Sequence, residues 1–158
     1  MPLKAKLQKD LSQALKDKEE TILSVLRMLL SAVLNKEKEK RYKLGEEKDV
    51  QLTDEEAVEA VSSEVKKRKE AIEAFQKGNR QDLVEKEKRE LEILQKYLPE
   101  QFSEEEVKKL VIEAIAKIGA KEAKDMGRVM AELMSKVKGR ADGSLVSKLV
   151  KELLISKE

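Results

Sequence analysis

The sequence contains neither cysteine nor histidine. Their absence excludes disulfide bonds, thiol nucleophiles, acid–base schemes that depend on histidine, and zinc sites built from the usual ligands. Carboxylate pairs and a lysine of lowered pKa remain as catalytic groups, but 32 acidic and 34 basic residues offer many accidental pairings. We therefore expect no catalytic residues, no metal site and no cofactor.

Aromatic residues are also scarce, at 3% of the chain, and tryptophan is absent. A core without aromatics is built from Leu, Ile, Val, Met and Ala, and 40% of the residues are apolar while 42% are charged. Lysine and glutamate, which dominate the charged residues, favour helices. The composition therefore predicts an all-α protein of amphipathic helices, and its Lys/Glu richness resembles that of proteins from hot environments.

No stretch approaches the roughly 20 consecutive apolar residues that are needed to cross a bilayer. The N-terminal segment carries Lys4, Lys6, Lys9 and Asp10 at positions where a secretory signal has an apolar stretch. These two features predict a soluble, cytoplasmic protein without a membrane partner.

Apolar residues recur at helical spacing near the N-terminus. Leucines at every fourth position over residues 3–15 predict a first helix, and the apolar stretch over residues 22–34 predicts a central second helix. Charges alternate over residues 36–49, which favours a frayed helix end followed by a mobile loop. The basic residues of this stretch either contact nucleic acid or belong to a solvated face diluted by Glu37 and Glu39, and we favour the second interpretation.

The next two helices are predicted to form an antiparallel hairpin. A capping box of Thr53 and Glu56 opens the third helix, and Gly78 ends it before the fourth begins. Counting outward from this turn places Arg68 opposite residues 87–90. We therefore expect an ion pair of Arg68 with Glu87 and Glu90, which fixes the register of the hairpin.

A proline marks the boundary between two parts of the chain. The extended step at Pro99 leads into a second capping box, formed by Ser103 and Glu106. Three shorter helical patterns follow, of which the second is expected to be capped by Asp125. The expected organisation is an N-terminal four-helix domain and a C-terminal three-helix domain, over residues 1–98 and 101–158.

Positive charge is concentrated in the C-terminal part. Residues 120–151 contain eight basic and four acidic residues, and so carry a net charge of +4. Lys136, Lys138 and Arg140 precede a helix expected to begin at Asp142, so mobile cations would lie beside backbone N–H donors that suit phosphate oxygens. A simpler interpretation remains open, in which Asp142 only caps a helix and the basic residues keep the surface soluble.

Two short motifs carry a resemblance to a known family. Gly127-Arg128-Val129-Met130 opens one expected helix, and Gly139-Arg140-Ala141-Asp142 leads into the last. Together with Tyr97-Leu98-Pro99 before a Ser-Glu-Glu helix start, they resemble the YqeY family over essentially the whole chain. The same motifs are similar to the tail domain of the B subunit of glutamyl/aspartyl-tRNA amidotransferase.

In the B subunit of the amidotransferase the tail is regarded as a tRNA-contacting appendage. The resemblance therefore implies a non-catalytic module that binds tRNA or another structured RNA, mainly through phosphate and sugar. Of the positions that it implies, only Arg128 and Arg140 lie within the matching motifs. The full set is Lys124, Arg128, Lys136, Lys138, Arg140, Lys148 and Lys151.

Two other functions remain open. The chain is alternatively a protein interaction module that docks on an amidotransferase or an aminoacyl-tRNA synthetase. Met126, Met130 and Met134 form a stripe that would suit such docking, although a stripe of this kind more often belongs to a core. A glutamine-dependent carbon–nitrogen ligase is implied by the family label alone, because the catalytic parts of the amidotransferase have no counterpart in 158 residues.

Overall fold

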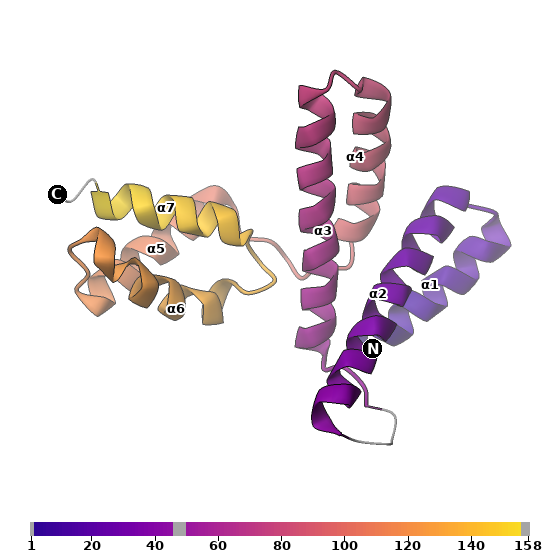
Figure 1. Cartoon of the computed structure of the whole chain (residues 1–158), viewed down its shortest axis with the longest axis horizontal. Coiled ribbons are helices and arrows are strands. Elements are labelled where there is room, and N and C mark those ends of the chain that lie inside the picture. The colour runs from indigo at the N-terminus through magenta and orange to yellow at the C-terminus, as the bar shows by residue number, and fades with distance from the viewer. Residues whose placement is uncertain (1, 46–49, 156–158) are drawn as a thin grey trace. The chain divides into compact units, whose positions relative to one another are not determined.

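The computed structural model describes residues 2–45 and 50–155. Within these residues the chain forms seven α-helices and one short 3-10 turn and has no β-strand, which confirms the predicted all-α class (Figure 1). The helices group into two compact units, Met1–Leu98 and Pro99–Glu158. Each unit has a hydrophobic core of its own.

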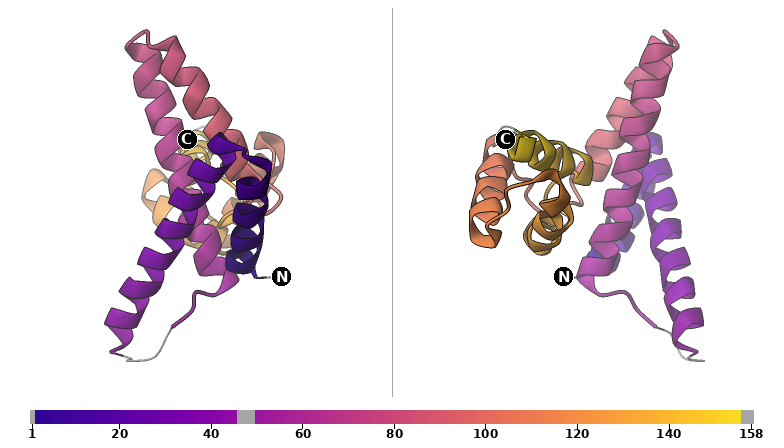
Figure 2. Two further views of the ribbon diagram at one scale, coloured as in Figure 1. Left: turned by 90° about the vertical axis from the view of Figure 1, so that its right-hand side faces the viewer. Right: turned by 60° about the vertical axis from the view of Figure 1, so that its left-hand side comes forward.

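The first unit consists of two antiparallel helical hairpins. α1 (Leu3–Asp17) pairs with α2 (Glu20–Leu44), and α3 (Asp54–Lys77) pairs with α4 (Gln81–Gln95). Figure 2 shows α1 beside α2 and α3 beside α4, in agreement with the contacts between them. The buried residues that form the shared core are Leu7, Ala14, Val25, Leu26, Leu29, Val33, Ala60, Val61, Val65, Leu94 and Tyr97.

Both predicted capping boxes are confirmed. At the start of α3, Glu56 N donates to Thr53 Oγ1 at 3.2 Å, and Thr53 N donates to Glu56 Oε2 at 2.8 Å. The same reciprocal pair joins Ser103 and Glu106 at the start of α5 (Glu104–Ile118). Each box satisfies two backbone donors that a helix start would otherwise leave without partners, so these boundaries are set locally.

The predicted ion pair across the second hairpin is also confirmed. Arg68 on α3 donates through Nη1 to Glu87 Oε2 on α4 at 2.8 Å, and the same nitrogen contacts a carboxylate oxygen of Glu90. Nη2 of Arg68 lies 2.9 Å from the sulfur of Met28 on α2. The Arg68 side chain is only 18% exposed, so one partly buried guanidinium joins three helices of the unit.

The prediction of a frayed helix end over residues 36–49 is wrong as far as Leu44, because α2 continues to that residue. Ion pairs to neighbouring helices hold this charged end in place. Glu37 is buried and lies 2.9 Å from Lys4 Nζ on α1. On the other side, Lys36 and Lys40 reach α3, at 3.0 Å from Glu59 and 2.7 Å from Glu56. Residues 46–49 of the predicted loop lie outside the described residues.

One leucine of the expected apolar stripe on α1 does not belong to the core. Leu7 is fully buried, whereas Leu15 is 59% exposed. A spacing of four residues advances by about 40° more than one helical turn, because the α-helix has 3.6 residues per turn. By Leu15 this drift has turned the side chain by roughly 80° from the direction of Leu7, and the buried position of that turn is occupied by Ala14.

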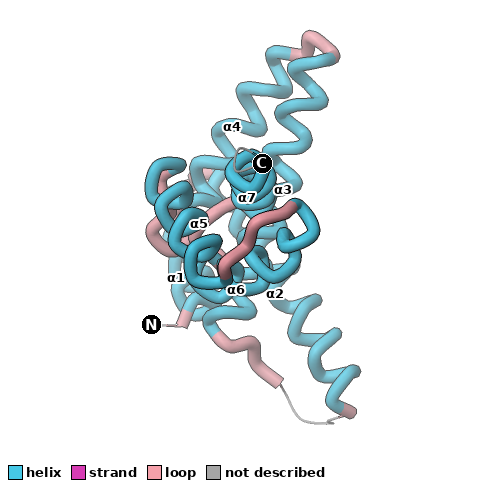
Figure 3. The backbone as a smooth tube through the Cα atoms, turned by 90° about the vertical axis from the view of Figure 1, so that its left-hand side faces the viewer, coloured by secondary structure: helices cyan, strands magenta, loops and turns pink. Residues whose placement is uncertain are grey.

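The second unit is a bundle of three helices. α5 is followed by the short turn η1 (Ala123–Asp125), α6 (Met126–Val137) and α7 (Gly143–Ile155) (Figure 3). Gly119, with φ of +73°, ends α5 in a conformation that favours glycine. The core consists of Val107, Val111, Ala114, Ile115, Ala120, Val129, Leu133, Val137, Val146, Leu149, Val150 and Leu154.

Across the part of the chain that the structure describes, no helix is both long enough and apolar enough to span a membrane.

Candidate nucleic-acid interface

Six of the seven basic residues expected to contact RNA lie towards one or the other end of the three-helix unit, and Lys148 lies near the middle of α7. Lys124 and Arg128 lie at η1 and the start of α6, whereas Lys136, Lys138 and Arg140 lie at or beyond its end. The rise of an α-helix places residues 128 and 138 about 15 Å apart along the axis. α7 runs back from the end of α6 and contacts η1, so Lys151 in its last turns lies towards the end that holds Lys124 (Figure 1).

Arg140 is engaged within its own unit. Its guanidinium carbon lies 3.8 Å from the centroid of the Phe102 ring, and its Nε donates to the carbonyl oxygen of Glu100 at 2.9 Å. The Phe102 amide in turn donates to the Arg140 carbonyl at 2.8 Å. The side chain that the sequence predicts to be a mobile cation therefore fastens the segment before α5 to the loop before α7.

The start of α7 offers fewer free donors than the sequence suggested. Asp142 acts as a cap, because Ser144 N donates to its Oδ1 at 2.9 Å. Gly139 has a φ of +75°, so it supplies the left-handed residue after the end of α6. The simpler interpretation of this loop, a helix stop followed by a cap, thus describes its backbone well.

Asp125 does not cap α6 with its side chain, which corrects the sequence prediction. It occupies the N-cap position, but its Oδ2 accepts hydrogen bonds from the backbone N–H groups of Lys121 and Glu122, at 3.0 and 3.2 Å. These bonds, first that from Lys121, hold the pKa of Asp125 below its ordinary value of 3.8. The carboxylate therefore closes the turn before α6, where Arg128 Nη2 also donates to the carbonyl oxygen of Ile118 at 3.1 Å.

The remaining lysines of the candidate set are exposed. Two of them, Lys124 and Lys136, form weak ion pairs with glutamates at the surface. Lys124 Nζ lies 3.0 Å from Glu122, with both side chains in solvent, and Lys136 lies 3.8 Å from Glu132. Such surface pairs contribute about 0–1 kcal/mol each, so an approaching phosphate can replace the carboxylate at little cost. Lys148 and Lys151 are exposed on α7 at a spacing of three residues, which places them on one helix face.

Glu132 has a stronger partner than Lys136. Lys117 Nζ donates to Glu132 Oε1 at 2.6 Å and so links α5 to α6. This bond is the main reason that the pKa of Glu132 lies below its ordinary value of 4.5, with smaller contributions from the charge of Lys117 and from Lys136. The carboxylate is thus committed mainly to Lys117, which leaves Lys136 more available to another anion.

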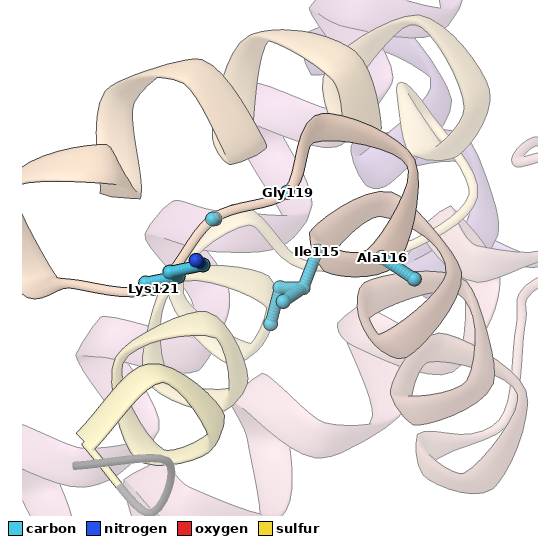
Figure 4. A pocket seen from close by; sticks show the side chains of 5 residues that line it. Ile115, Ala116, Gly119 and Lys121 are labelled. Carbon is cyan, nitrogen blue, oxygen red and sulfur yellow. The ribbon is translucent and has the colours of Figure 1, made fainter.

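A hollow at the end of α5 was not expected from the sequence. It has a volume of about 420 Å³ and is lined by Ile115, Ala116, Gly119, Ala120 and Lys121. Figure 4 shows the Ile115 side chain between those of Lys121 and Ala116. Lys121 is the one titratable side chain among the five residues of this lining, so the lining itself has no pair of titratable groups for acid–base chemistry.

Fold and site together define a class: an all-α protein of two helical units whose C-terminal bundle displays cations at both ends. Among the described residues there is no group of three or more carboxylates placed to hold a metal ion. The chain belongs to the YqeY family, since the model of Yqey-like proteins matches residues 4–154.

Curated fungal proteins are similar to the chain. One is "Altered inheritance of mitochondria protein 41, mitochondrial" of Pyrenophora tritici-repentis, 33% identical over 96% of this chain and 81% of the relative. An uncharacterised protein of Schizosaccharomyces pombe is 34% identical over 64% of this chain and 76% of its own length. The protein 41 of Lachancea thermotolerans is 40% identical over 60% of this chain and 46% of its own length.

The comparison corrects the predicted localisation. The relatives from Pyrenophora, Lachancea and Candida glabrata are named as mitochondrial proteins, which contradicts the expectation of a cytoplasmic protein. The expectation used only the lack of an apolar segment. Such a segment marks export or membrane insertion, and its absence does not distinguish one internal compartment from another.

Proposed function

We propose that the protein is a non-catalytic RNA-binding accessory module, with tRNA as its first candidate ligand, and that its C-terminal unit supplies the contacts. The observation that carries the proposal is the placement of exposed cations at both ends of one small bundle. Lys124 and Arg128 lie at one end of α6, and Lys136 and Lys138 lie at the other.

The spacing of these cations favours a large polyanion over a small anionic ligand. Groups about 15 Å apart along a helix cannot converge on one phosphate, but they can meet separate phosphates of one folded RNA. The contacts would be made to phosphate and sugar, because the unit contains one aromatic side chain, and that side chain is covered by Arg140. Recognition would then depend on the shape of the RNA.

Binding by this mechanism depends on salt. Each neutralised phosphate releases condensed counterions, and about three to five contacts would lower the affinity by one to two decades or more over a few-fold rise in salt. An affinity that is independent of salt would contradict the proposal.

The test is fluorescence anisotropy of labelled bulk tRNA with the full chain at two salt concentrations. The variant Lys124→Gln/Lys136→Gln/Lys148→Gln/Lys151→Gln removes four exposed charges and spares Arg140, whose loss would also disturb the fold. Its matched control, Lys86→Gln/Lys88→Gln/Arg89→Gln/Lys96→Gln, removes the same charge from exposed positions on or next to α4. We expect the tail variant to lose salt-sensitive binding and the control to keep it. Equal losses in both variants would show only a response to net charge.

A second function is favoured by exposed apolar residues on each helix of the C-terminal unit. Ile112 on α5, Met134 on α6 and Ile155 on α7 remain exposed, whereas Met126 and Met130 pack against the core. Such residues suit docking on a protein, with an amidotransferase or an aminoacyl-tRNA synthetase as candidate partners. Capture of either partner that survives nuclease treatment, together with absence of tRNA binding, would favour this function.

A further inference from the structure

The outer side of the α1–α2 hairpin carries positive charge without exposed acids. Over residues 3–16 and 21–38, which the structure describes in full, no exposed residue is an aspartate or a glutamate. The exposed acids of the hairpin lie at its turn, at residues 17–20, or beyond Lys38. Among the exposed residues of these ranges, we name the following seven, which lie opposite the buried side of their helices, the hairpin face: Lys9, Ser12, Lys16, Arg27, Ser31, Leu34 and Lys38.

Helical spacing places these residues on two stripes, one on each helix of the hairpin. Lys9, Ser12 and Lys16 follow one another at intervals of three and four on α1. Arg27, Ser31, Leu34 and Lys38 do the same on α2. Each stripe lies opposite the buried residues of its own helix, and the two helices lie side by side (Figure 2).

Tertiary contacts remove one of the two acids that dilute this charge in the sequence, while Glu39 remains exposed beyond Lys38. The segment Lys36–Lys40 alternates base and acid, but Glu37 is buried against Lys4. Lys36 and Lys40 turn inward to the acids of α3, which leaves Lys38 outside.

The acid in the middle of α1, Asp10, is removed in the same way. The Oδ2 of Asp10 accepts a hydrogen bond from the Tyr97 hydroxyl at 2.7 Å, so this carboxylate is directed towards the core. The charges that remain outside on α1 are therefore lysines, up to the turn at residue 17.

We propose that the hairpin face is a second RNA-contacting surface, which binds the phosphodiester backbone in addition to the C-terminal unit; this rests on the RNA-binding function proposed above. Arg27 and Lys38 lie about 16 Å apart along α2, which exceeds the reach of a single phosphate. The exposed Ser31 hydroxyl between Arg27 and Lys38 is a further donor to phosphate and sugar oxygens. The Ser12 hydroxyl instead donates to the Gln8 carbonyl oxygen. Charge complementarity thus favours an extended polyanion as the occupant.

An aromatic residue extends the same surface. Tyr42 follows Lys38 by one helical turn and is 89% exposed, which leaves both faces of its ring open. An unpaired base at the edge of a folded RNA can stack on such a ring, and stacking contributes about 1–3 kcal/mol per base. An anionic membrane fits the surface less well, because interfacial helices insert an apolar face and the apolar face of α2 is in the core.

The test uses the full chain, labelled bulk tRNA and the variant Lys9→Gln/Lys16→Gln/Arg27→Gln/Lys38→Gln. The α4 control variant described above removes the same charge from cations that stand among exposed acids such as Glu85 and Glu92. We expect the dissociation constant to rise at least about tenfold in the hairpin variant, and the slope of log affinity against log salt to fall by about 2–3. Circular dichroism would verify that both variants keep their helices.

Comparison with the tail variant separates this inference from the proposed function. If the hairpin variant binds as tightly as the control while the tail variant fails, the second surface is overturned and the proposed function stands. If the hairpin variant fails while the tail variant binds normally, the hairpin face is supported and the tail is not the binding unit. Absence of binding by the wild type at low salt overturns both.

Substitutions of Tyr42 test the same surface without changing the net charge of the protein. We expect Tyr42→Ala to weaken binding several-fold and Tyr42→Phe to retain it, because phenylalanine also stacks. An equal loss in both variants would contradict stacking at this position.

Discussion

The guanidinium of Arg140 lies over the ring of Phe102, 3.8 Å from its centroid, while the Phe102 amide bonds to the Arg140 carbonyl. A basic residue within a motif that suggests RNA binding is thus also a structural fastener between two segments of the C-terminal unit. We expect Arg140→Ala to lower the stability of this unit by about 1–2 kcal/mol, from a lost cation–π contact and a lost hydrogen bond. Chemical denaturation would measure the effect, with Lys136→Ala as a control that changes stability by less than about 0.5 kcal/mol. Unchanged stability with loss of tRNA binding would instead assign Arg140 to the RNA.

Arg68→Ala should be the most damaging single substitution in the N-terminal unit. The substitution leaves the carboxylates of Glu87 and Glu90 partly buried without their cation. Removing one partner of a buried ion pair typically lowers the free energy of unfolding by about 3–5 kcal/mol. Thermal unfolding would measure the loss. In the background Glu87→Gln/Glu90→Gln the same substitution should cost much less, because no charge is then left without a partner. Equal costs in the two backgrounds would show that the pair is not coupled.

Gly127→Ala is expected to raise the stability of the C-terminal unit and, if RNA contacts this position, to lower the affinity for tRNA. Gly127 lies in the first turn of α6, and a Cβ built there would meet no atom within 4 Å. Glycine in a helix costs about 0.5–1 kcal/mol relative to alanine, so the substitution should stabilise the unit by that amount. If RNA approaches this backbone closely, tRNA affinity should fall in the anisotropy measurement, whereas Ser135→Ala on the same helix should not lower it. A stabilised variant with unchanged affinity would contradict close approach at this glycine.

Glu37→Ala should loosen the charged end of α2. The substitution removes the ion pair with Lys4, which ties this end to α1, and a hydrogen bond between charged groups contributes about 1.5–3 kcal/mol. Amide hydrogen exchange of residues 38–44 should then accelerate at least about tenfold. Glu39→Ala, at an exposed neighbouring position, is the control. Equal protection in the two variants would show that the ion pair does not hold this end of the helix.

We expect the protein to lose stability at alkaline pH because the pKa of Tyr97 is raised in the folded state. Burial, and then the hydrogen bond to Asp10, raise the pKa of Tyr97 above its ordinary value of 10.0. Because the pKa is higher in the folded state than in the unfolded state, the contribution of Tyr97 is complete below about pH 10 and is lost as the pH rises towards the folded pKa. In Tyr42→Phe, which leaves Tyr97 as the one tyrosine, phenolate absorbance should appear only well above pH 10 or together with unfolding. Absorbance that rises at pH 10 without unfolding would contradict this.

The sequence determined the features that depend on nearby residues. The two capping boxes follow from a Ser or Thr three positions before a Glu, and helix type follows from apolar spacing. The pairing of Arg68 with Glu87 was also predictable, because a short turn fixes the register of the helices on either side of it. The family motifs at Gly127 and Gly139 are likewise local, which is why the sequence carries the resemblance.

Only the tertiary structure decided which charged side chains remain in solvent. Glu37 and Glu39 are alike in sequence, but packing against α1 buries the first and leaves the second exposed. The guanidinium of Arg140 is engaged by the ring of Phe102, a residue far away in the sequence. An ion pair or a ring contact between distant segments depends on where the backbone brings them together. The sequence therefore determined the helices, the family and the presence of basic surfaces, whereas folding selected the cations that remain exposed to solvent.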